Sequence, residues 1–289
     1  MAVKAVFFDL DDTLAATSEF DARAYAAVED EAERASPKLN TKTLVKDYKA
    51  CLKKEPWDSG YPSAEAVPLF EHRVGLWKSA LQMQAEAFQH IAIEAATSFN
   101  NAAQQDEPNP LHGLMVQAAA QAAVESATCA LAEQLQSTFD RQRMADFVLL
   151  DGAAELIHRL RRNGLSVVII TSGHDEVQRA KLKACRAAEI VGEGNILVGG
   201  EELRAGREDK PSASIFMRAC AIAGCEASDA VMIGDSLSSD IQGAINACLA
   251  ASIWVNPSSR SLEKGEPEPT FQVTSIFELE DILRKLKRS

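Results

Sequence analysis

A short apolar run near the N-terminus ends in three carboxylates within four residues. The run is Val6–Phe8, and the acids that follow it are Asp9, Asp11 and Asp12. A run of this length that is rich in Phe and Val is typical of a buried strand. Carboxylates at the end of such a strand are costly unless they are paired, bound to a metal or catalytic. Ligands of open parallel sheets bind beyond the carboxyl ends of the strands, so this run predicts an active site on the first strand.

Three further apolar runs, all in the second half of the chain, predict additional strands of the same sheet. They span residues 165–171, 230–235 and 251–255. The segments that separate or follow these runs have helical patterning: 175–187, 212–223, 239–247 and 275–287. Ser275 and Glu278 have the spacing of a capping box at the start of the last helix. Apolar strands that alternate with helices are typical of a parallel sheet covered on both faces, so we expect an α/β fold.

The region between the first strand and the rest of the sheet has a different pattern. It contains no convincing buried strand and is rich in Ala, Glu and Gln at helical spacing, as in residues 118–136. Asparagine and proline predict a loop over residues 100–113. We therefore expect a helical domain at 16–149, inserted into an α/β core made of residues 1–15 and 150–289.

The composition is that of an ordinary globular protein, with 46% hydrophobic and 25% charged residues among 289. A chain of this length can form two domains. The net charge of -12 argues against binding to nucleic acids or to anionic membrane surfaces, because both require a basic surface. A local basic pocket for a small anionic substrate is compatible with this charge.

The six cysteines are scattered, and none forms a CxxC pair or has zinc-ligand spacing to a histidine. We therefore expect reduced thiols and a cytoplasmic protein. Acidic residues interrupt the apolar segment at the N-terminus, so no signal peptide is expected, and no apolar run is long enough to span a bilayer. We expect a monomer or a homodimer that acts on a small metabolite.

Polar residues that suit phosphate chemistry follow the predicted strands in a fixed order along the chain. They are Asp9 and Asp11, then Thr171, Ser172 and Gly173, then Lys210, and finally Asp235 with Asp240. Taken singly, each is more often a cap, a turn residue or a solvated surface residue. Together they suit phosphoryl transfer, in which a phosphate dianion repels a carboxylate nucleophile unless positive charge lies nearby.

The residues can supply every part of such a reaction. Lys210 offers one positive charge, and a Mg²⁺ ion held by Asp9 and Asp235 offers more. Thr171 and nearby backbone N–H groups can bind the remaining phosphate oxygens. One carboxylate then attacks phosphorus, and a second protonates the leaving alcohol and later activates water. Two acids two residues apart can divide these roles, because like charges raise the pKa of one of them.

This set of residues resembles the four motifs of the haloacid dehalogenase superfamily. The matching segments are Asp9-x-Asp11-x-Thr13, Thr171, Lys210 and Gly234-Asp235-x-x-x-x-Asp240. The resemblance implies a Rossmann-like core with a parallel sheet, an inserted helical cap of the C1 type and a Mg²⁺ cofactor. It makes Asp9 the nucleophile and a metal ligand, and Asp235 a further metal ligand. Asp11 would be the general acid/base, with its backbone carbonyl on the metal.

The remaining roles concern phosphate binding and support. The phosphate-binding residues that the resemblance implies are Thr171, Ser172, Gly173 and Lys210, and Lys210 would also orient the nucleophile. Asp240 would hold either this lysine or a metal-bound water, and Thr13 would support the first motif loop. One departure from the family follows the 239–247 helix, where Cys248 replaces the usual glycine.

Two features narrow the class of enzyme within the superfamily. Members that resemble 2-haloacid dehalogenases lack the second acid of the first motif, so Asp11 favours phosphate ester hydrolysis. The segments 209–216 and 231–244 are similar to those of N-acylneuraminate-9-phosphatases, although 5′-nucleotidases and phosphoglycolate phosphatases share much of this pattern.

The sequence therefore predicts a Mg²⁺-dependent phosphomonoester hydrolase that forms an aspartyl-phosphate intermediate. The preferred substrate is a small phosphorylated metabolite, best represented by a sugar phosphate such as N-acylneuraminate 9-phosphate. A 5′-nucleotidase or phosphoglycolate phosphatase is the alternative, and a sugar phosphomutase shares the same residues. A non-catalytic binding protein of this fold, or a scaffold acting through residues 84–130, has no need of the complete motif set.

Overall fold

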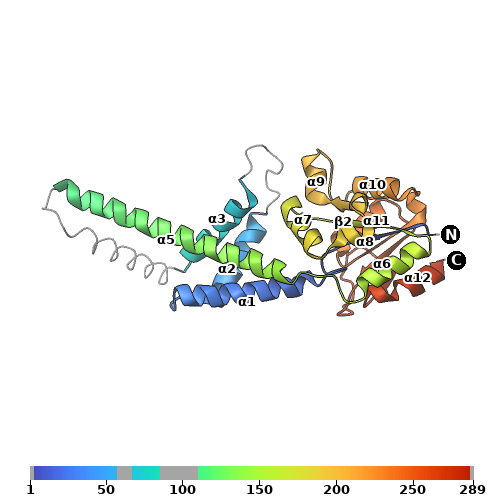
Figure 1. Cartoon of the computed structure of the whole chain (residues 1–289), viewed down its shortest axis with the longest axis horizontal. Coiled ribbons are helices and arrows are strands. Elements are labelled where there is room, and N and C mark those ends of the chain that lie inside the picture. Colours follow the sequence, from blue (N-terminus) through green and yellow to red (C-terminus); the bar gives the residue numbers. More distant parts are fainter. Residues whose placement is uncertain (1–2, 57–66, 85–109, 287–289) are drawn as a thin grey trace. The chain divides into compact units, whose positions relative to one another are not determined.

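The computed structural model describes residues 3–56, 67–84 and 110–286 (Figure 1). The chain divides into two compact units. One comprises Met1–Phe20 and Asp146–Ser289, and the other is Asp21–Ala145. Among the helices of the described residues, none is long and apolar enough to cross a membrane.

The first unit is built on a six-stranded sheet in the order β3-β2-β1-β4-β5-β6, and every neighbouring pair of strands is parallel. The strands are β1 (Ala5–Phe8), β2 (Ser166–Thr171), β3 (Ile196–Val198), β4 (Ala230–Gly234), β5 (Ala251–Val255) and β6 (Phe271–Val273). The predicted α/β fold with a parallel sheet is therefore confirmed. The sequence pattern missed β3 and β6, because three residues are too few to show a period.

Alternate side chains of the strands enter two separate apolar cores, one on each face of the sheet. On one face, Val6 and Phe8 pack with residues of α6 (Ala153–Arg162), α7 (Asp175–Ala184) and α12 (Leu279–Leu286). On the other face, Phe7 packs with residues of α10 (Ala213–Ala223) and α11 (Gln242–Asn246). Burial on both faces explains why the strands are continuously apolar rather than alternating.

The register of the sheet brings the ends of three neighbouring strands to one edge. Phe8 of β1 pairs with Ile169 of β2 and with Ile233 of β4. The backbone N–H of Asp9 continues this ladder and donates to the carbonyl of Ile233 at 3.0 Å. Residues that directly follow β2, β1 and β4 therefore lie in this order along one edge of the sheet.

The helices of the sheet unit differ from the predicted ones mainly at their ends. The predicted 175–187 helix is two helices, because Arg186 adopts a left-handed φ of 56° between α7 and α8 (Ala187–Val191). The predicted 212–223 helix begins one residue later, with Ser212 as its N-cap. Residues 239–247 form a π-helical turn, η3 (Leu237–Ile241), followed by α11. The capping box of Ser275 and Glu278 is confirmed.

The second unit is helical in its described residues, as the sequence predicts. Its helices are α2 (Thr41–Lys54), α3 (Leu69–Gln82), α5 (Pro110–Ala145) and most of α1 (Thr17–Ala35). Its core contains Tyr48 and Trp77, whose rings stack at 3.7 Å between centroids. Gln136 Oε1 accepts hydrogen bonds from the Trp77 indole at 3.1 Å and from the Tyr48 hydroxyl at 3.3 Å.

The loop predicted over residues 100–113 is wrong at its C-terminal end. α5 already begins at Pro110, and proline is well tolerated at the first position of a helix because no N–H is required there. Residues 100–109 lie outside the described residues. The same holds for residues 85–109 of the segment 84–130.

Candidate active site

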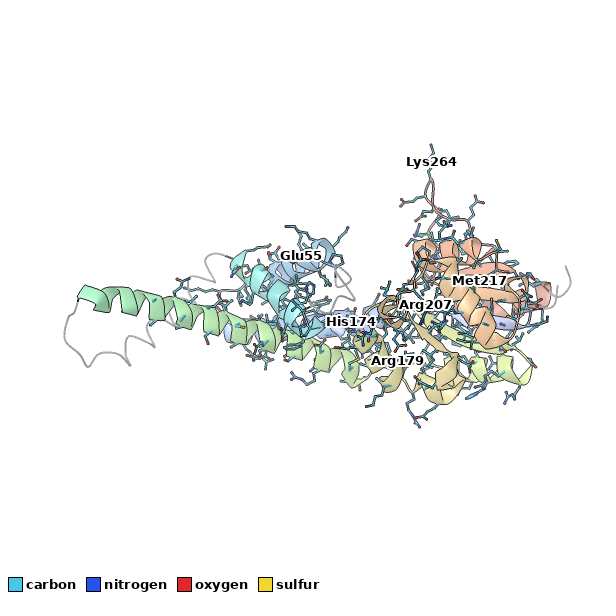
Figure 2. All side chains as sticks on the ribbon, turned by 90° about the horizontal axis from the view of Figure 1, so that it is seen from above. Glu55, His174, Arg179, Arg207, Met217 and Lys264 are labelled. Carbon is cyan, nitrogen blue, oxygen red and sulfur yellow. The ribbon has the colours of Figure 1, made fainter. Side chains whose placement is uncertain are left out.

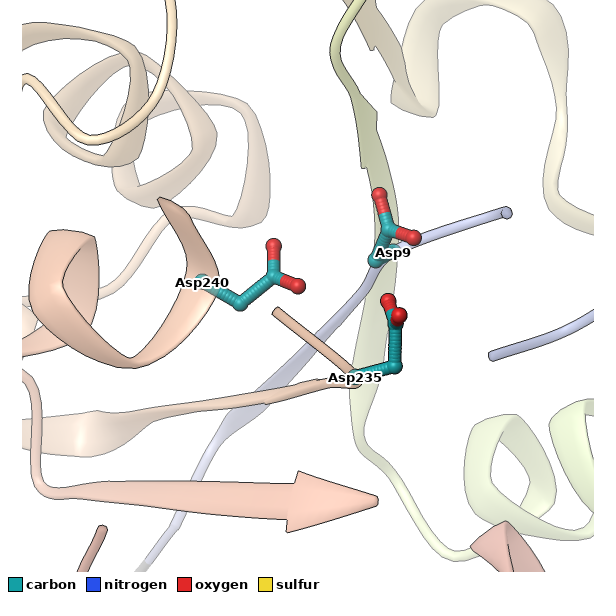
Figure 3. Close-up of side chains that lie close together, drawn as sticks. All are labelled: Asp9, Asp235 and Asp240. Atoms are coloured by element: carbon teal, nitrogen blue, oxygen red, sulfur yellow. The ribbon is translucent and has the colours of Figure 1, made fainter. Parts of the chain in front are cut away.

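Three aspartates meet where β1 and β4 end. Asp9 directly follows β1, Asp235 directly follows β4, and Asp240 lies in η3. Each contributes one carboxylate oxygen to a group whose atoms all lie within 4.8 Å of one another. Figure 3 shows the three side chains lying close together. The motif resemblance implies a supporting role for Asp240, whereas the structure brings its carboxylate into the same cluster.

The ammonium of Lys210 is buried between two of these carboxylates. Its Nζ donates to Asp9 Oδ1 at 2.6 Å, to Asp240 Oδ1 at 2.7 Å and to the carbonyl of Ile170 at 3.0 Å. Burial alone would lower the pKa of Lys210, but the charges of Asp240 and Asp9 raise it above its usual value. Lys210 is therefore a permanent cation that fixes the orientation of Asp9.

Position 234, directly before Asp235 in the motif, has room for glycine but not for a side chain. A Cβ built on Gly234 would lie 2.2 Å from Asp240 Oδ2, so any side chain there would displace this carboxylate. The same Oδ2 atom accepts a hydrogen bond from the backbone N–H of Ser236 at 3.1 Å. The close backbone approach at the end of β4 thus sets the position of Asp240, and through it that of Lys210.

The acidic cluster carries more negative charge than Lys210 offsets. Burial raises the pKa of Asp235 to about 7, with further contributions from the charges of Asp240 and Asp12. Burial also raises the pKa of Asp9 well above its usual value, although the charge of Lys210 opposes this shift. The carboxylate oxygens of Asp9, Asp235 and Asp240 lie close enough together to bind one cation. The oxygen donor set fits a hard divalent cation such as Mg²⁺.

The residues after β2 supply the other side of the site. Thr171 is fully buried, and its hydroxyl has no hydrogen-bond partner among the described residues. Ser172 donates its hydroxyl to Asp209 Oδ1 at 2.9 Å, and the same oxygen accepts the backbone N–H of Lys210 at 2.6 Å. Asp209 therefore links the Ser172 loop to the Lys210 segment. No role for Asp209 was predicted from the sequence.

Most of the predicted site residues line one cavity, which has a volume of about 170 Å³. It is lined by Asp9, Asp11, Asp12, Ser172, Lys210, Asp235, Ser236, Ser239 and Asp240. Thr171, Gly173 and Thr13 do not line this cavity. Thr13 instead lines a neighbouring cavity of about 510 Å³ that shares Asp12 and Asp235 with the first. Its buried hydroxyl has no hydrogen-bond partner among the described residues.

Asp11 lies in the cavity wall, but its carboxylate is outside the acidic cluster. Lys181 Nζ lies 2.8 Å from both carboxylate oxygens, and Gln178 and Thr17 also donate to them. Burial alone would raise the pKa of Asp11, but Lys181 and these hydrogen bonds lower it below its usual value. Asp9 and Asp11 thus have pKa values shifted in opposite directions, although they are two residues apart.

Lys181 and Gln178 were missed by the sequence analysis. Both lie in the helix predicted over residues 175–187, three residues apart, so they share a face of α7. A lysine and a glutamine on a surface helix usually face solvent, and the sequence held no signal that this face is buried.

The parallel sheet with an acidic centre at the ends of its strands and an inserted helical unit is an α/β core of the Rossmann-like type. Residues 3–247 match the family described as haloacid dehalogenase-like hydrolase, and the chain belongs to this family. The resemblance identified from the sequence is thereby confirmed.

Relatives of known activity match part of the chain. N-acylneuraminate-9-phosphatase of Mus musculus is 33% identical over 156 residues, which is 54% of this chain and 60% of that protein. The pyrimidine 5′-nucleotidase YjjG of Escherichia coli is 36% identical over 137 residues, or 47% of this chain and 57% of that protein. Each match spans less than two thirds of the relative.

Solved structures of the same fold match nearly the whole chain. The HAD hydrolase YfnB of Bacillus subtilis, a structure bound to magnesium, has a TM-score of 0.61 at 20% identity and covers 98% of this chain and 99% of its own. The 2-haloacid dehalogenase of Pseudomonas syringae has a TM-score of 0.57 at 22% identity, with the same coverage. At these identities the similarity shows the fold alone.

Proposed function

We propose that this protein is a Mg²⁺-dependent phosphomonoester hydrolase that acts through an aspartyl-phosphate on a small phosphorylated metabolite. The observation that carries the proposal is the contact of 2.6 Å between Lys210 Nζ and Asp9 Oδ1 in a cavity that also contains Asp235. A buried carboxylate oriented by a lysine is suited to nucleophilic attack on phosphorus. The lysine also supplies positive charge for the phosphate oxygens.

Asp9 and Asp235 are the side chains we propose as ligands of Mg²⁺, together with the backbone carbonyl of Asp11. When bound, the ion would neutralise charge on the phosphate and on the acidic cluster. Asp240 is bound to Lys210 through one oxygen, which supports its role as a positioning residue for the lysine. The buried hydroxyl of Thr171 and the loop at Ser172 and Gly173 are proposed to bind phosphate oxygens.

The reaction then proceeds in two displacements at phosphorus. The carboxylate of Asp9 attacks, the bond from phosphorus to the alcohol oxygen breaks, and this oxygen takes a proton from Asp11. Water attacks the aspartyl-phosphate and gives a proton to Asp11. The bond from phosphorus to Asp9 breaks, which releases inorganic phosphate and restores both side chains.

The substrate that we favour is a sugar phosphate such as N-acylneuraminate 9-phosphate. This choice is supported by the 33% identity to the N-acylneuraminate-9-phosphatase of Mus musculus. The second candidate is a 5′-nucleotidase acting on pyrimidine nucleotides, supported by the 36% identity to the Escherichia coli enzyme. We further propose that the helical unit acts as a cap that closes over the substrate and selects it.

A cytoplasmic location is proposed from the cysteines, all of which are free thiols. The proposal includes a monomer or a homodimer as the working form. Size-exclusion chromatography with light scattering tests this oligomeric state, and an assembly larger than a dimer would contradict it.

The substrate is tested by phosphate release from a panel at equal concentration with Mg²⁺. The panel contains N-acetylneuraminate 9-phosphate, pyrimidine nucleoside 5′-monophosphates, phosphoglycolate and hexose phosphates. We expect kcat/KM for the 9-phosphate to exceed that of every other compound by at least ~10-fold, about 1.4 kcal/mol of transition-state binding. A preference for the nucleotides would replace the first candidate by the second.

A further inference from the structure

The carboxylate of Asp11 is held by side chains that no motif of the sequence predicts. Lys181 Nζ donates to both carboxylate oxygens at 2.8 Å, and Gln178 Nε2 donates to Oδ2 at 2.8 Å. Thr17 donates its hydroxyl to Oδ1 at 2.5 Å. Hydrogen bonds to both oxygens from three directions restrict rotation of this carboxylate.

Lys181 is unusual because it is a buried lysine on a helix. Its side chain is 3% exposed, and its ammonium lies 6.0 Å from the centre of the Phe147 ring. Removing an ammonium from water is costly unless a charge partner compensates, and the carboxylate of Asp11 provides that partner. The fold therefore places a cation against Asp11 at a cost in solvation.

Gln178 connects Asp11 to the loop proposed to bind phosphate. Besides Asp11, its Nε2 donates to the backbone carbonyl of Ser172. Gly173 has a φ of 122°, and a Cβ there would lie 3.0 Å from Gln178 Nε2. A glycine at position 173 thus leaves room for the amide that joins the two parts of the site.

The helix that carries both residues is fixed to its neighbour by ion pairs. Arg179 of α7, labelled in Figure 2, donates to both carboxylate oxygens of Glu201 at 2.6 and 2.7 Å. Asp175 at the start of α7 pairs with Arg204 at 2.5 Å. Glu201 and Arg204 both belong to α9 (Gly199–Arg204). Lys181 and Gln178 therefore project from an anchored helix.

We propose that Lys181 and Gln178 are positioning residues that orient the carboxylate of Asp11 as the base for hydrolysis of the aspartyl-phosphate, an inference that rests on the proposed function. A carboxylate two residues from Asp9 would otherwise be drawn to the cation proposed for Asp9 and Asp235. Held by these side chains of α7, the carboxylate of Asp11 stays apart from the acidic cluster and is joined to the Ser172 loop through Gln178.

The test separates formation of the aspartyl-phosphate from its hydrolysis. An aryl phosphate with a good leaving group needs no proton to form the intermediate, so release of the aryl alcohol in stopped flow reports formation alone. We expect Lys181→Met to keep a rapid burst of aryl alcohol of about one per active site. Its steady-state rate should fall about 10-fold or more, but by no more than the ~10²–10⁴-fold that acid–base catalysis contributes in total.

Matched variants complete the experiment. Lys183→Met changes an exposed lysine of the same helix and should behave as wild type. Lys181→Arg keeps the charge and should recover part of the steady-state rate. In an Asp11→Ala background, Lys181→Met should cause no additional loss, because residues that act through one another are not additive. Gln178→Met leaves the ammonium of Lys181 paired with Asp11, so it should keep the burst and lose less of the steady-state rate. This variant replaces Lys181→Met in the experiment if Lys181→Met does not fold.

Equal losses in the burst rate and the steady-state rate would overturn the inference, as would an additive loss in the Asp11→Ala background. An unchanged or increased steady-state rate in Lys181→Met would overturn it as well. A wild-type protein that releases no phosphate would instead remove the proposed function, and the inference with it. An active wild type with any of the other contrary results removes the inference alone.

Discussion

Lys210 Nζ lies 2.6 Å from Asp9 Oδ1, although the two residues are 201 positions apart in the chain. The contact exists because the parallel register brings the end of β1 beside the carbonyl of Ile170 in β2, which also accepts a hydrogen bond from this ammonium. A buried cation that pairs with carboxylates from two different motifs makes the stability of the core depend on the residues proposed to be catalytic.

The first prediction concerns removal of this buried charge. Lys210→Met keeps the volume but leaves Asp9 and Asp240 without their ammonium, so we expect a loss of about 3–5 kcal/mol in the free energy of unfolding. Urea denaturation of the metal-free protein measures this loss. Lys183→Met is the matched control, because this exposed lysine should change stability by less than ~0.5 kcal/mol. A loss below 1 kcal/mol in Lys210→Met would contradict the buried ion pairs.

The second prediction concerns the close approach at Gly234. In Gly234→Ala, the new Cβ would lie 2.2 Å from Asp240 Oδ2, so the carboxylate must move away from Lys210. We expect a fall in kcat/KM of about 10²-fold, since misplacement of about 1 Å can cost this much. Gly194→Ala is the control, because a Cβ there meets no atom within 4 Å. Equal activity of the two variants would refute this explanation of the motif.

The third prediction concerns pH and Mg²⁺. The pKa of Asp235 in the folded protein is about 7, well above its unfolded value of about 4. Between these values the folded state binds more protons than the unfolded state, so the metal-free protein should lose stability as pH rises from about 4 to 7. Because a proton and a cation compete for this carboxylate, the affinity for Mg²⁺ should rise with pH up to about 7 and level off above it.

The variant that checks this prediction is Asp235→Asn, which cannot ionise. At pH 8 without metal, we expect it to exceed the wild type in stability by about 1 kcal/mol or more, or ~2–4 °C in Tm. The increase in Tm that Mg²⁺ produces in the wild type should be absent. If Asp235→Asn were less stable than the metal-free wild type at pH 8, burial of the ionised Asp235 carboxylate would not be what lowers the stability of the wild type.

The fourth prediction concerns the cysteine that replaces glycine after α11. Cys248 is exposed and has a φ of 53°, a left-handed conformation that disfavours residues with a Cβ. Cys248→Gly should therefore raise the free energy of unfolding by about 1 kcal/mol without changing kcat. Cys225→Gly, at a half-buried position with ordinary φ, should destabilise instead. A loss of stability in Cys248→Gly would mean that the thiol makes a compensating contact.

The sequence predicted the parts of the molecule that carry a strong local signal. The run ending at Phe8 and the run 251–255 are buried strands as expected, because a strand covered on both faces must be continuously apolar. The motif residues Asp9, Lys210 and Asp235 come together at one cavity, since the ends of parallel strands share one edge of the sheet.

What the sequence could not provide is burial of polar residues by tertiary packing. Lys181 and Asp209 look like surface residues in sequence, yet the first is buried against Asp11 and the second joins Ser172 to Lys210. Such contacts depend on segments that are distant in the chain and leave no local period.

The central claim is that Asp9 is the nucleophile of a Mg²⁺-dependent phosphatase. The most direct test measures phosphate release from an aryl phosphate by the wild type and by Asp9→Asn, each with Mg²⁺ and with excess chelator. Circular dichroism and Tm confirm that both proteins are folded. We predict release by the wild type with Mg²⁺ alone, and a rate at least ~10³-fold lower in Asp9→Asn. Release by Asp9→Asn at a rate near that of the wild type would contradict the account.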